Sequence, residues 1–147
     1  MPIFPEEPLL PQQAAQVPAL TLAYLGDTLY DLYVRSRLVS THEDTTGRLN
    51  RRAIAFVSAV GQSRALKALW DRLNEEERQI AQRGRNAKTP TAAKNASIQD
   101  YHFATALETL LGYLYLSGQD SRAKEIMTWA YDATEAAAGK EDANCPK

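Results

Sequence analysis

The segment TLAYLGDTLYDLYVRSRLV, residues 21–39, constrains the fold of this chain more than any other. Four leucines recur in it at helical spacing, at Leu22, Leu25, Leu29 and Leu32. Most other positions of residues 19–34 are apolar too, and a helix that is apolar nearly all round is buried in a core or a subunit interface. Asp27 should cost free energy in such a helix, and Gly26 should weaken it.

The rest of the chain also shows helical periodicity, and no segment alternates as a β-strand does. We expect a helical stretch over 48–73 divided at Gly61, a helix within 74–86 capped by Asn74, and a loop over 83–97 that overlaps its end. A helix over 98–118 and a last helix capped by Asp120 or Ser121 follow. Prolines at 2, 5, 8, 11 and 18 predict a non-helical start. The fold class is therefore predicted to be all-α.

The length of 147 residues and a hydrophobic content of 44% fit one globular domain, which we place at 16–137 between tails of 1–15 and 138–147. The chain shows neither the features of a signal peptide nor an apolar run of membrane-spanning length. The single cysteine, Cys145, excludes a disulfide within the chain. A cytoplasmic protein without a membrane partner is expected.

Charge is unevenly distributed along the chain. The net charge is −1, but residues 48–94 hold eleven of the seventeen Lys and Arg residues and only four of the eighteen acids. Such asymmetry is typical of a face that binds a polyanion. A solvated helical face with scattered arginines is the alternative explanation.

Asp27 and Glu108 are the two acids that lie amid the apolar residues of core-type helices. Each has small neighbours on its own helix face: Ala23 and Gly26 for Asp27, and Ala104, Thr105 and Gly112 for Glu108. If the two helices pack together, both carboxylates could converge on a hard cation such as Mg²⁺.

A purely structural role for the two acids is the other interpretation. In that case they would be hydrogen-bonded to buried Arg35, Tyr24 or Tyr113. Asp31 shares the helix face of Asp27 and could assist a metal ion indirectly, although an ion pair with Arg35 four residues later explains it more simply.

Several segments together resemble a known family. AYLGDTLYDLYVRSRLV is similar to the signature helix of the ribonuclease III catalytic domain, and FATALETLLGYLYLSG to its second catalytic helix. Between them, FVSAVGQ and RGRNAKTPTAAKNASIQDY resemble the short variant called Mini-ribonuclease III. Ala23 and Thr105 stand where the full enzyme has two further carboxylates, and the short variant also lacks these acids.

The resemblance implies a homodimeric helical bundle in which the signature helices of two subunits pack together. It implies a magnesium-dependent endoribonuclease that cleaves double-stranded RNA and leaves 3′-hydroxyl and 5′-phosphate ends, with Asp27 and Glu108 as catalytic residues and Mg²⁺ ligands. The substrate implied is the 23S ribosomal RNA precursor, trimmed at its 5′ and 3′ ends during ribosome biogenesis. A ribosomal protein is a possible further partner.

No segment of this sequence corresponds to the separate RNA-binding domain of the full enzyme, so the catalytic domain is expected to hold the duplex unaided. The segment from Arg78 to Lys94 has five basic residues and no acids. The predicted RNA-binding residues are five from this segment and one that follows it: Arg83, Arg85, Asn86, Lys88, Lys94 and Asn95. The arginines at 48, 51 and 52 are candidates for extending the same surface.

Two alternatives to an enzyme follow from the residues. With only two acids in place of four, the fold could serve as a non-catalytic binding or ribosome-assembly factor for double-stranded RNA. An all-α protein-interaction module, with structural acids, is the second alternative.

Overall fold

The computed structural model describes residues 7–88 and 97–144, and for 140–144 only the course of the backbone. Seven α-helices and one short 3₁₀ helix make up the described chain: α1 (Pro11–Gln16), α2 (Ala19–Thr41), α3 (Thr46–Val57), α4 (Ala59–Leu69), η1 (Trp70–Arg72), α5 (Glu75–Asn86), α6 (Ile98–Leu116) and α7 (Asp120–Asn144). These residues contain no strand, which confirms the all-α prediction.

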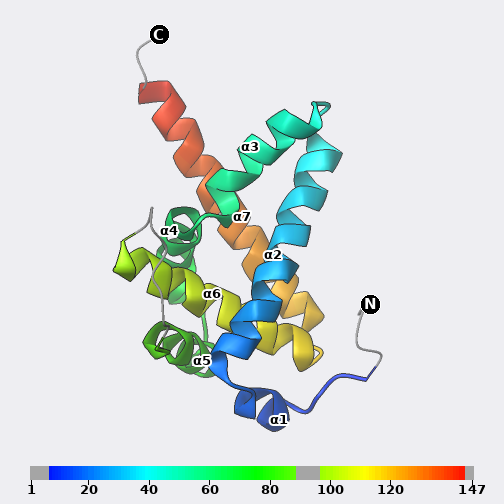
Figure 1. The fold of residues 1–147 in the computed structure, drawn as a ribbon, viewed down its shortest axis with the longest axis vertical. Coiled ribbons are helices and arrows are strands. Elements are labelled where there is room, and N and C mark those ends of the chain that lie inside the picture. Colours follow the sequence, from blue (N-terminus) through cyan, green and yellow to red (C-terminus); the bar gives the residue numbers. More distant parts are fainter. Residues whose placement is uncertain (1–6, 89–96, 145–147) are drawn as a thin grey trace.

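Helix α6 is the centre of the fold. It packs against α2, α4 and α5, and α7 packs mainly against α4 (Figure 1). Leu107, Leu110, Leu111 and Leu114 on α6 are fully buried. Because α6 is surrounded by other helices, it must be apolar on nearly every side, and this is the property that its sequence shows.

The start of the chain differs from the prediction. Residues 11–16, expected to be non-helical, form α1, which begins at Pro11, where the missing amide N–H and the fixed φ angle of proline suit a first helical turn. Ala14 on α1 is fully buried in the core, and the backbone amide of Leu9 donates to the carbonyl of Leu116 at 2.7 Å. The segment before α2 is therefore attached to the end of α6.

The division between α3 and α4 lies at Ser58 and not at Gly61. Ser58 has extended backbone angles, ends α3, and caps α4 by accepting a hydrogen bond from the amide of Gly61 at 3.1 Å. Gly61 is needed for a close contact, because a Cβ there would lie 2.0 Å from the carbonyl oxygen of Ala55.

The other helix ends agree in part with the sequence prediction. Asn74 caps α5 as expected, within a reciprocal capping box with Glu77. Helix α5 ends at Asn86, the last residue of the predicted helical stretch, so residues 83–86 are helical and not part of the overlapping predicted loop. Helix α7 continues to Asn144, past the predicted boundary at residue 137. Asp120 is the first residue of α7, and Gly118 ends the α6 region with a φ angle of 72°.

An ion pair between Arg122 and the buried Glu77 connects α7 with α5. The Arg122 guanidinium on α7 donates to both carboxylate oxygens of Glu77 on α5 at 2.8 Å, and to the carbonyl oxygen of Arg72 at 3.0 Å. The hydroxyl of Tyr113 on α6 donates to Glu76 at 2.6 Å. These contacts fix α5 against both α6 and α7.

Candidate active site

The two predicted catalytic acids meet where α2 crosses α6. Asp27 lies in the middle of α2 and Glu108 in the middle of α6, and their carboxyl groups are close enough to share a hydrogen bond when one of them carries a proton. The structure therefore brings together two side chains that are 81 positions apart in the sequence.

Glycines allow this close approach of the two helices. A Cβ on Gly26 would lie 1.8 Å from the carbonyl oxygen of Glu108, and a Cβ on Gly112 would lie 2.0 Å from that of Leu22. Both glycines are buried, and each faces the backbone of the other helix. Gly26 is thus explained by contact within the same chain, with α6 as the partner helix.

The neighbouring positions are small, as the sequence predicted. Ala23 and Ala104 are buried, and Thr105 is buried with its hydroxyl donating to the carbonyl of Tyr101 at 2.9 Å. The hydroxyl of Thr105 is therefore hydrogen-bonded within α6. Asp27 and Glu108 supply the carboxylates at this crossing.

Within one chain, helix α2 is buried along one side only, and burial of its other side in a subunit interface stays a prediction. The buried residues are Leu22, Ala23, Gly26, Tyr30, Val34 and Leu38. Leu32 is 52% exposed, Tyr24 is 82% exposed, and Asp27 itself is exposed. Asp27 therefore reaches solvent, whereas Glu108 is half-buried.

The surroundings raise the pKa of both acids. Burial raises the pKa of Glu108 to about 8, with further contributions from the charge of Asp27 and from the hydrogen bond between them. Burial also raises the pKa of Asp27, as does the charge of Asp31, while the hydrogen bond from Glu108 opposes this rise. The pair therefore shares a proton at neutral pH when no cation is present.

The residues expected to compensate the acids in a structural role are engaged elsewhere. Arg35 pairs with Asp31 at 2.8 Å, as the spacing predicted, and Tyr113 donates to Glu76. Tyr24 points largely to solvent. In the described part of the chain, no Lys, Arg or His side chain forms an ion pair with Asp27 or Glu108, which leaves the pair without a positive partner.

The donor set suits a hard divalent cation. Two facing carboxylates, one of them open to solvent, offer the oxygen ligands that Mg²⁺ prefers, and leave room for water and substrate ligands. No group of three or more His, Cys, Asp or Glu side chains able to hold a metal ion occurs among the described residues.

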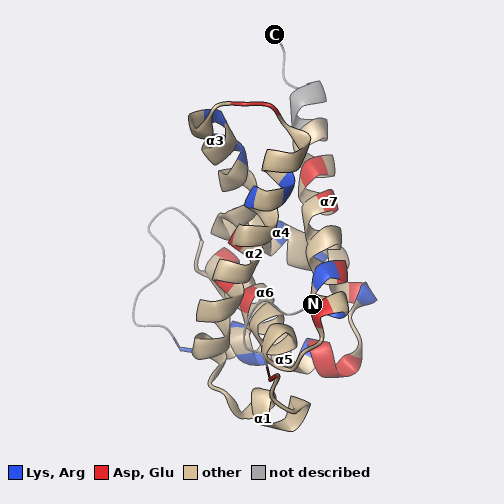
Figure 2. Cartoon of the chain, turned by 90° about the vertical axis from the view of Figure 1, so that its right-hand side faces the viewer, with Lys and Arg blue, Asp and Glu red and all other residues tan. Residues whose placement is uncertain are grey.

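The residues predicted to bind RNA lie at the end of α5 and beyond it. Figure 2, in which the positions of Lys and Arg are blue, shows basic residues on α3 and near α5. Helix α5 itself begins with acidic residues in its first turn. Asn86 and Lys88 are exposed, and Lys94 and Asn95 lie outside the described residues. The exposed groups of this set are available for a phosphate backbone.

Two arginines of this set have contacts within the protein. Arg83 donates to the backbone carbonyls of Ala15 and Val17, the second at 3.3 Å, and so it satisfies the end of α1. Arg85 lies with its guanidinium carbon 4.9 Å from the ring centre of Phe103. Arg85 is exposed, and it keeps its charge at the surface.

The arginines of α3 are exposed as well. Arg48 and Arg52 lie 3.5 and 3.6 Å from the Asp44 carboxylate, and together with a backbone hydrogen bond from Thr45 they outweigh partial desolvation and lower its pKa. Arg51 is exposed on the same helix. One carboxylate thus offsets part of the positive charge of α3.

Sequence reasoning did not single out Phe103 or Lys67, although the structure places both Lys67 and Arg85 against the Phe103 ring. Their proximity depends on α4 and α5 both packing on α6, and helical periodicity gives no signal for such a contact.

Within the described segments, no helix is both long and apolar enough to cross a bilayer.

Comparison with known proteins shows the family to which this chain belongs. The Ribonuclease III domain family matches residues 20–119, a range that includes both Asp27 and Glu108. The chain belongs to the ribonuclease III domain family, and it is an endoribonuclease.

Individual proteins of this family that are similar to the chain share one name. The chain is 42% identical to Mini-ribonuclease 3 of Clostridium tetani over 134 residues, 90% of this chain and 89% of the relative. It is 45% identical to Mini-ribonuclease 3 of Brevibacillus brevis, over 79% of this chain and 87% of the relative. A crystal structure of a Fusobacterium nucleatum protein superposes with a TM-score of 0.72 at 30% identity, covering 80% of this chain and 93% of that one. The resemblance seen in the sequence is confirmed.

Proposed function

We propose that this protein is a magnesium-dependent endoribonuclease that cleaves double-stranded RNA and leaves 3′-hydroxyl and 5′-phosphate ends. The observation that carries the proposal is the meeting of Asp27 and Glu108 at the crossing of α2 and α6, without a cationic partner among the described residues. Family membership supports the same reaction class.

The two carboxylates have different parts in this chemistry. Asp27 is exposed and can reach a metal ion together with its water and phosphate ligands, whereas Glu108 is half-buried and held in place by the contact of α6 with Gly26. When bound, Mg²⁺ supplies a water of lowered pKa and neutralises charge on the phosphate. Because a carboxylate must be deprotonated to bind a metal ion, Glu108 would release its proton if both acids held the cation.

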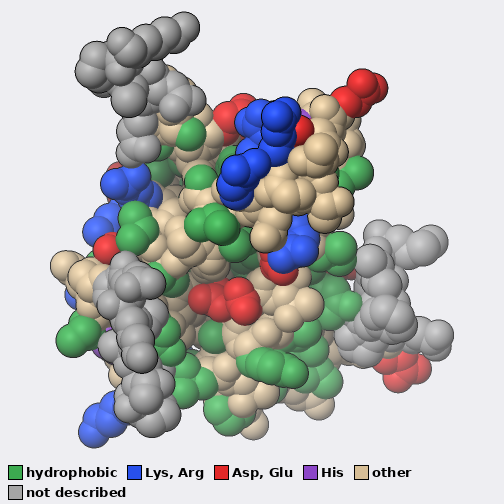
Figure 3. Space-filling view, turned by 45° about the horizontal axis from the view of Figure 1, so that its top comes forward, with side chains coloured by type: hydrophobic (Ala, Val, Ile, Leu, Met, Phe, Trp, Pro, Cys, Tyr) green, Lys and Arg blue, Asp and Glu red, His purple; other side chains and the backbone are tan. Residues whose placement is uncertain are grey.

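A homodimer is part of the proposal. The exposed side of α2 carries apolar residues that the fold of one chain leaves uncovered: Leu20, Tyr24, Leu32 and Val39. Figure 3 shows hydrophobic side chains at several places on one face of the molecule, with an acidic patch among them. Two subunits related by a two-fold axis would present one pair of acids to each strand of a duplex.

The duplex contacts are proposed for the end of α5 and the segment that follows it. Arg85, Asn86 and Lys88 are exposed there, and Lys94 and Asn95 continue the same basic segment in the sequence. Arg83 can contribute its charge while it holds α1. Phosphate and 2′-hydroxyl groups across the minor groove are the expected partners.

The relatives named Mini-ribonuclease 3 support a more specific assignment. We place the protein in the cytoplasm, with the 23S ribosomal RNA precursor as its substrate and a ribosomal protein as a further partner. These assignments rest on the family resemblance, because no residue of the site identifies a particular duplex.

A cleavage assay tests the proposal. An end-labelled RNA duplex is incubated with wild type, Asp27→Asn and Glu108→Gln, each with Mg²⁺ and with a chelator. We expect cutting only by wild type with Mg²⁺, while the circular dichroism of both variants stays unchanged. A duplex that wild type binds but leaves intact under every condition would favour a non-catalytic RNA-binding factor.

A further inference from the structure

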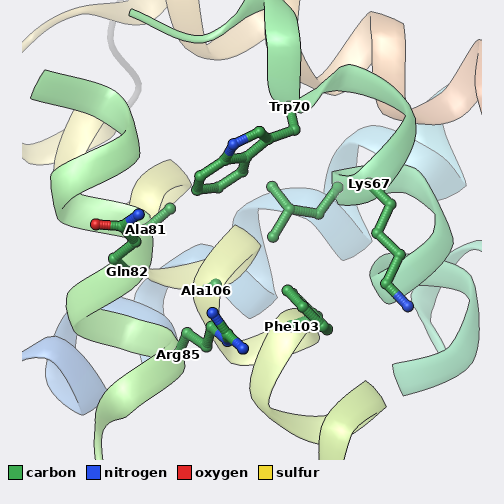
Figure 4. A pocket seen from close by; sticks show the side chains of 8 residues that line it. Lys67, Trp70, Ala81, Gln82, Arg85, Phe103 and Ala106 are labelled. Atoms are coloured by element: carbon green, nitrogen blue, oxygen red, sulfur yellow. The ribbon is translucent and has the colours of Figure 1, made fainter. Parts of the chain in front are cut away.

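A pocket of about 410 Å³ opens between α4, α5 and α6, with η1 at its edge (Figure 4). None of the residues that line it belongs to α2, so the pocket is separate from the Asp27–Glu108 pair. Leu66, Ala81 and Ala106 form its apolar part, and each is at most 1% exposed. Its volume lies within the range of about 300–1,000 Å³ of small-molecule sites.

Two aromatic side chains line the pocket. Figure 4 shows Trp70 and Phe103 on opposite sides of it, and both are half-buried. Half-buried rings of this kind present a face on which a planar group can stack. Every nucleobase has such a planar face, and stacking on aromatic side chains is tolerant of base identity.

Two cations flank Phe103. The guanidinium carbon of Arg85 lies 4.9 Å, and Nζ of Lys67 lies 4.8 Å, from the centre of its ring. In the described parts of the chain, neither cation forms a hydrogen bond or an ion pair, and no acid lines the pocket. This charge pattern favours an anionic ligand.

One acid lies near Lys67. Asp100 lies in the first turn of α6, and its pKa is lowered by the side chains of Ser63 and Ser97 and by the charges of Lys67 and Arg64. Asp100 is not among the residues that line the pocket. Arg85 has no comparable acid beside it in the described parts of the chain, so the positive charge of the pocket is only partly offset.

We propose that this pocket binds a nucleoside monophosphate group, with the base stacked on Trp70 and the phosphate held by Arg85 and Lys67 beside Phe103. Such a group has two sources, an unpaired nucleotide of an RNA chain or a free nucleotide. The first source rests on the proposed function, since it would place single-stranded RNA next to a bound duplex. The second source does not depend on that function.

Adenosine 5′-monophosphate is the probe for the pocket itself. Titration into the ¹⁵N-labelled protein should shift the indole signal of Trp70 and leave that of Trp129 unchanged. Lys67→Gln and Trp70→Leu should each weaken binding about ten-fold, the loss of one stacking or charged contact. Lys124→Gln removes an exposed charge on α7 and serves as the matched control, with unchanged affinity.

RNA binding distinguishes the two sources. With chelator present to prevent cutting, a duplex with two unpaired 3′ nucleotides is compared with a blunt duplex of the same sequence. If the pocket takes an unpaired nucleotide of RNA, wild type prefers the first duplex, and Lys67→Gln and Trp70→Leu lose the preference. If only the free nucleotide binds, the pocket is upheld and its ligand is the free nucleotide.

The pocket proposal falls if neither the nucleotide nor the unpaired end binds, or if Lys124→Gln weakens binding as much as Lys67→Gln. Its failure is separable from that of the proposed function, because cleavage of the blunt duplex by wild type with Mg²⁺ does not require the pocket. Normal cleavage without nucleotide binding would overturn only the pocket, whereas nucleotide binding without any cleavage would overturn only the nuclease.

Discussion

Glu108 is a carboxylic acid whose proton is held by its surroundings at neutral pH. Burial and the nearby charge of Asp27 raise its pKa from an ordinary 4.5 to about 8, so the folded protein binds this proton more tightly than the unfolded chain does. The resulting stabilisation is fully present below pH 4.5 and is lost as the pH rises through 8.

The metal-free protein should therefore become less stable between pH 5 and pH 8. The free energy of unfolding should fall by up to about 1.4 kcal/mol for each pH unit, the value of one fully linked proton. Urea unfolding at several pH values measures this slope. In Glu108→Gln, which has no proton to release, the slope should be much smaller, and an equal slope in the variant would refute the assignment.

At the residue scale, the sequence predicted the Asp27–Glu108 pair but not its environment. The two acids within apolar helical segments, and their small neighbours, could be recognised in the sequence because each pattern lies within one helix. The exposure of Asp27 was not predictable, since the apolar residues Tyr24 and Leu32 beside it are themselves exposed. Similarly, nothing local indicates that Arg83 donates to Ala15 and Val17, which lie 66 or more positions away.

At the scale of elements, the contact of α2 with α6 depends on Gly26. Gly26→Ala would place a Cβ 1.8 Å from the carbonyl oxygen of Glu108, so the helices must separate. We expect a loss of about 1–3 kcal/mol in the free energy of unfolding, as for overpacked cores. Cleavage activity should also fall, because the two carboxylates move apart, and denaturant unfolding beside the duplex assay measures both effects.

Gly47→Ala is the matched control. Gly47 lies in the first turn of α3, and a Cβ there would meet nothing within 4 Å. Alanine is favoured over glycine in helices by about 1 kcal/mol, so this variant should be neutral or slightly more stable. If Gly26→Ala behaved like Gly47→Ala, the backbone contact would not be essential.

The ion pair between α5 and α7 gives a second prediction at this scale. Arg122→Leu leaves the Glu77 carboxylate, whose side chain is 4% exposed, without its cation. We expect a loss of about 3 kcal/mol in the free energy of unfolding. Arg48→Leu breaks the exposed contact with Asp44 and should cost under about 1 kcal/mol, so equal losses in the two variants would contradict the argument.

Helix existence was largely predictable from periodicity, and helix ends were less so. The cap at Asn74 was found because it is a local signal, whereas the break at Ser58 was assigned to Gly61, three residues later. In α1, prolines were taken to prevent a helix, although Pro11 suits the first turn. The contacts that decide these ends, such as Gly61 against Ala55, come from folding of the chain back on itself.

At the scale of the whole molecule, the uncovered side of α2 predicts a dimer. Tyr24 is 82% exposed, so Tyr24→Arg should leave the fold of one chain intact and destabilise an interface formed by this side. Sedimentation should then show a shift from dimer to monomer. Ile98→Arg changes a residue that is 65% exposed on α6 and should remain dimeric, and a dimeric Tyr24→Arg would place the interface elsewhere.

The family could be recognised from the sequence because its motifs lie in continuous segments, and residues 20–119 match it. The central position of α6 follows less directly, since it requires knowing which helices pack on it. The pocket beside Phe103 was not predictable, because Lys67, Arg85 and Phe103 come from three helices.

The central claim is that Asp27 and Glu108 together hold a divalent cation, and proton release on metal binding tests it most directly. Mn²⁺ is titrated into the protein at pH 7 by calorimetry in two buffers of different ionisation enthalpy. Because Glu108 has a pKa of about 8, binding should release about one proton per chain, and Asp27→Asn and Glu108→Gln should abolish the release. Binding without proton release that is unchanged in both variants, or no binding at all, would contradict the account.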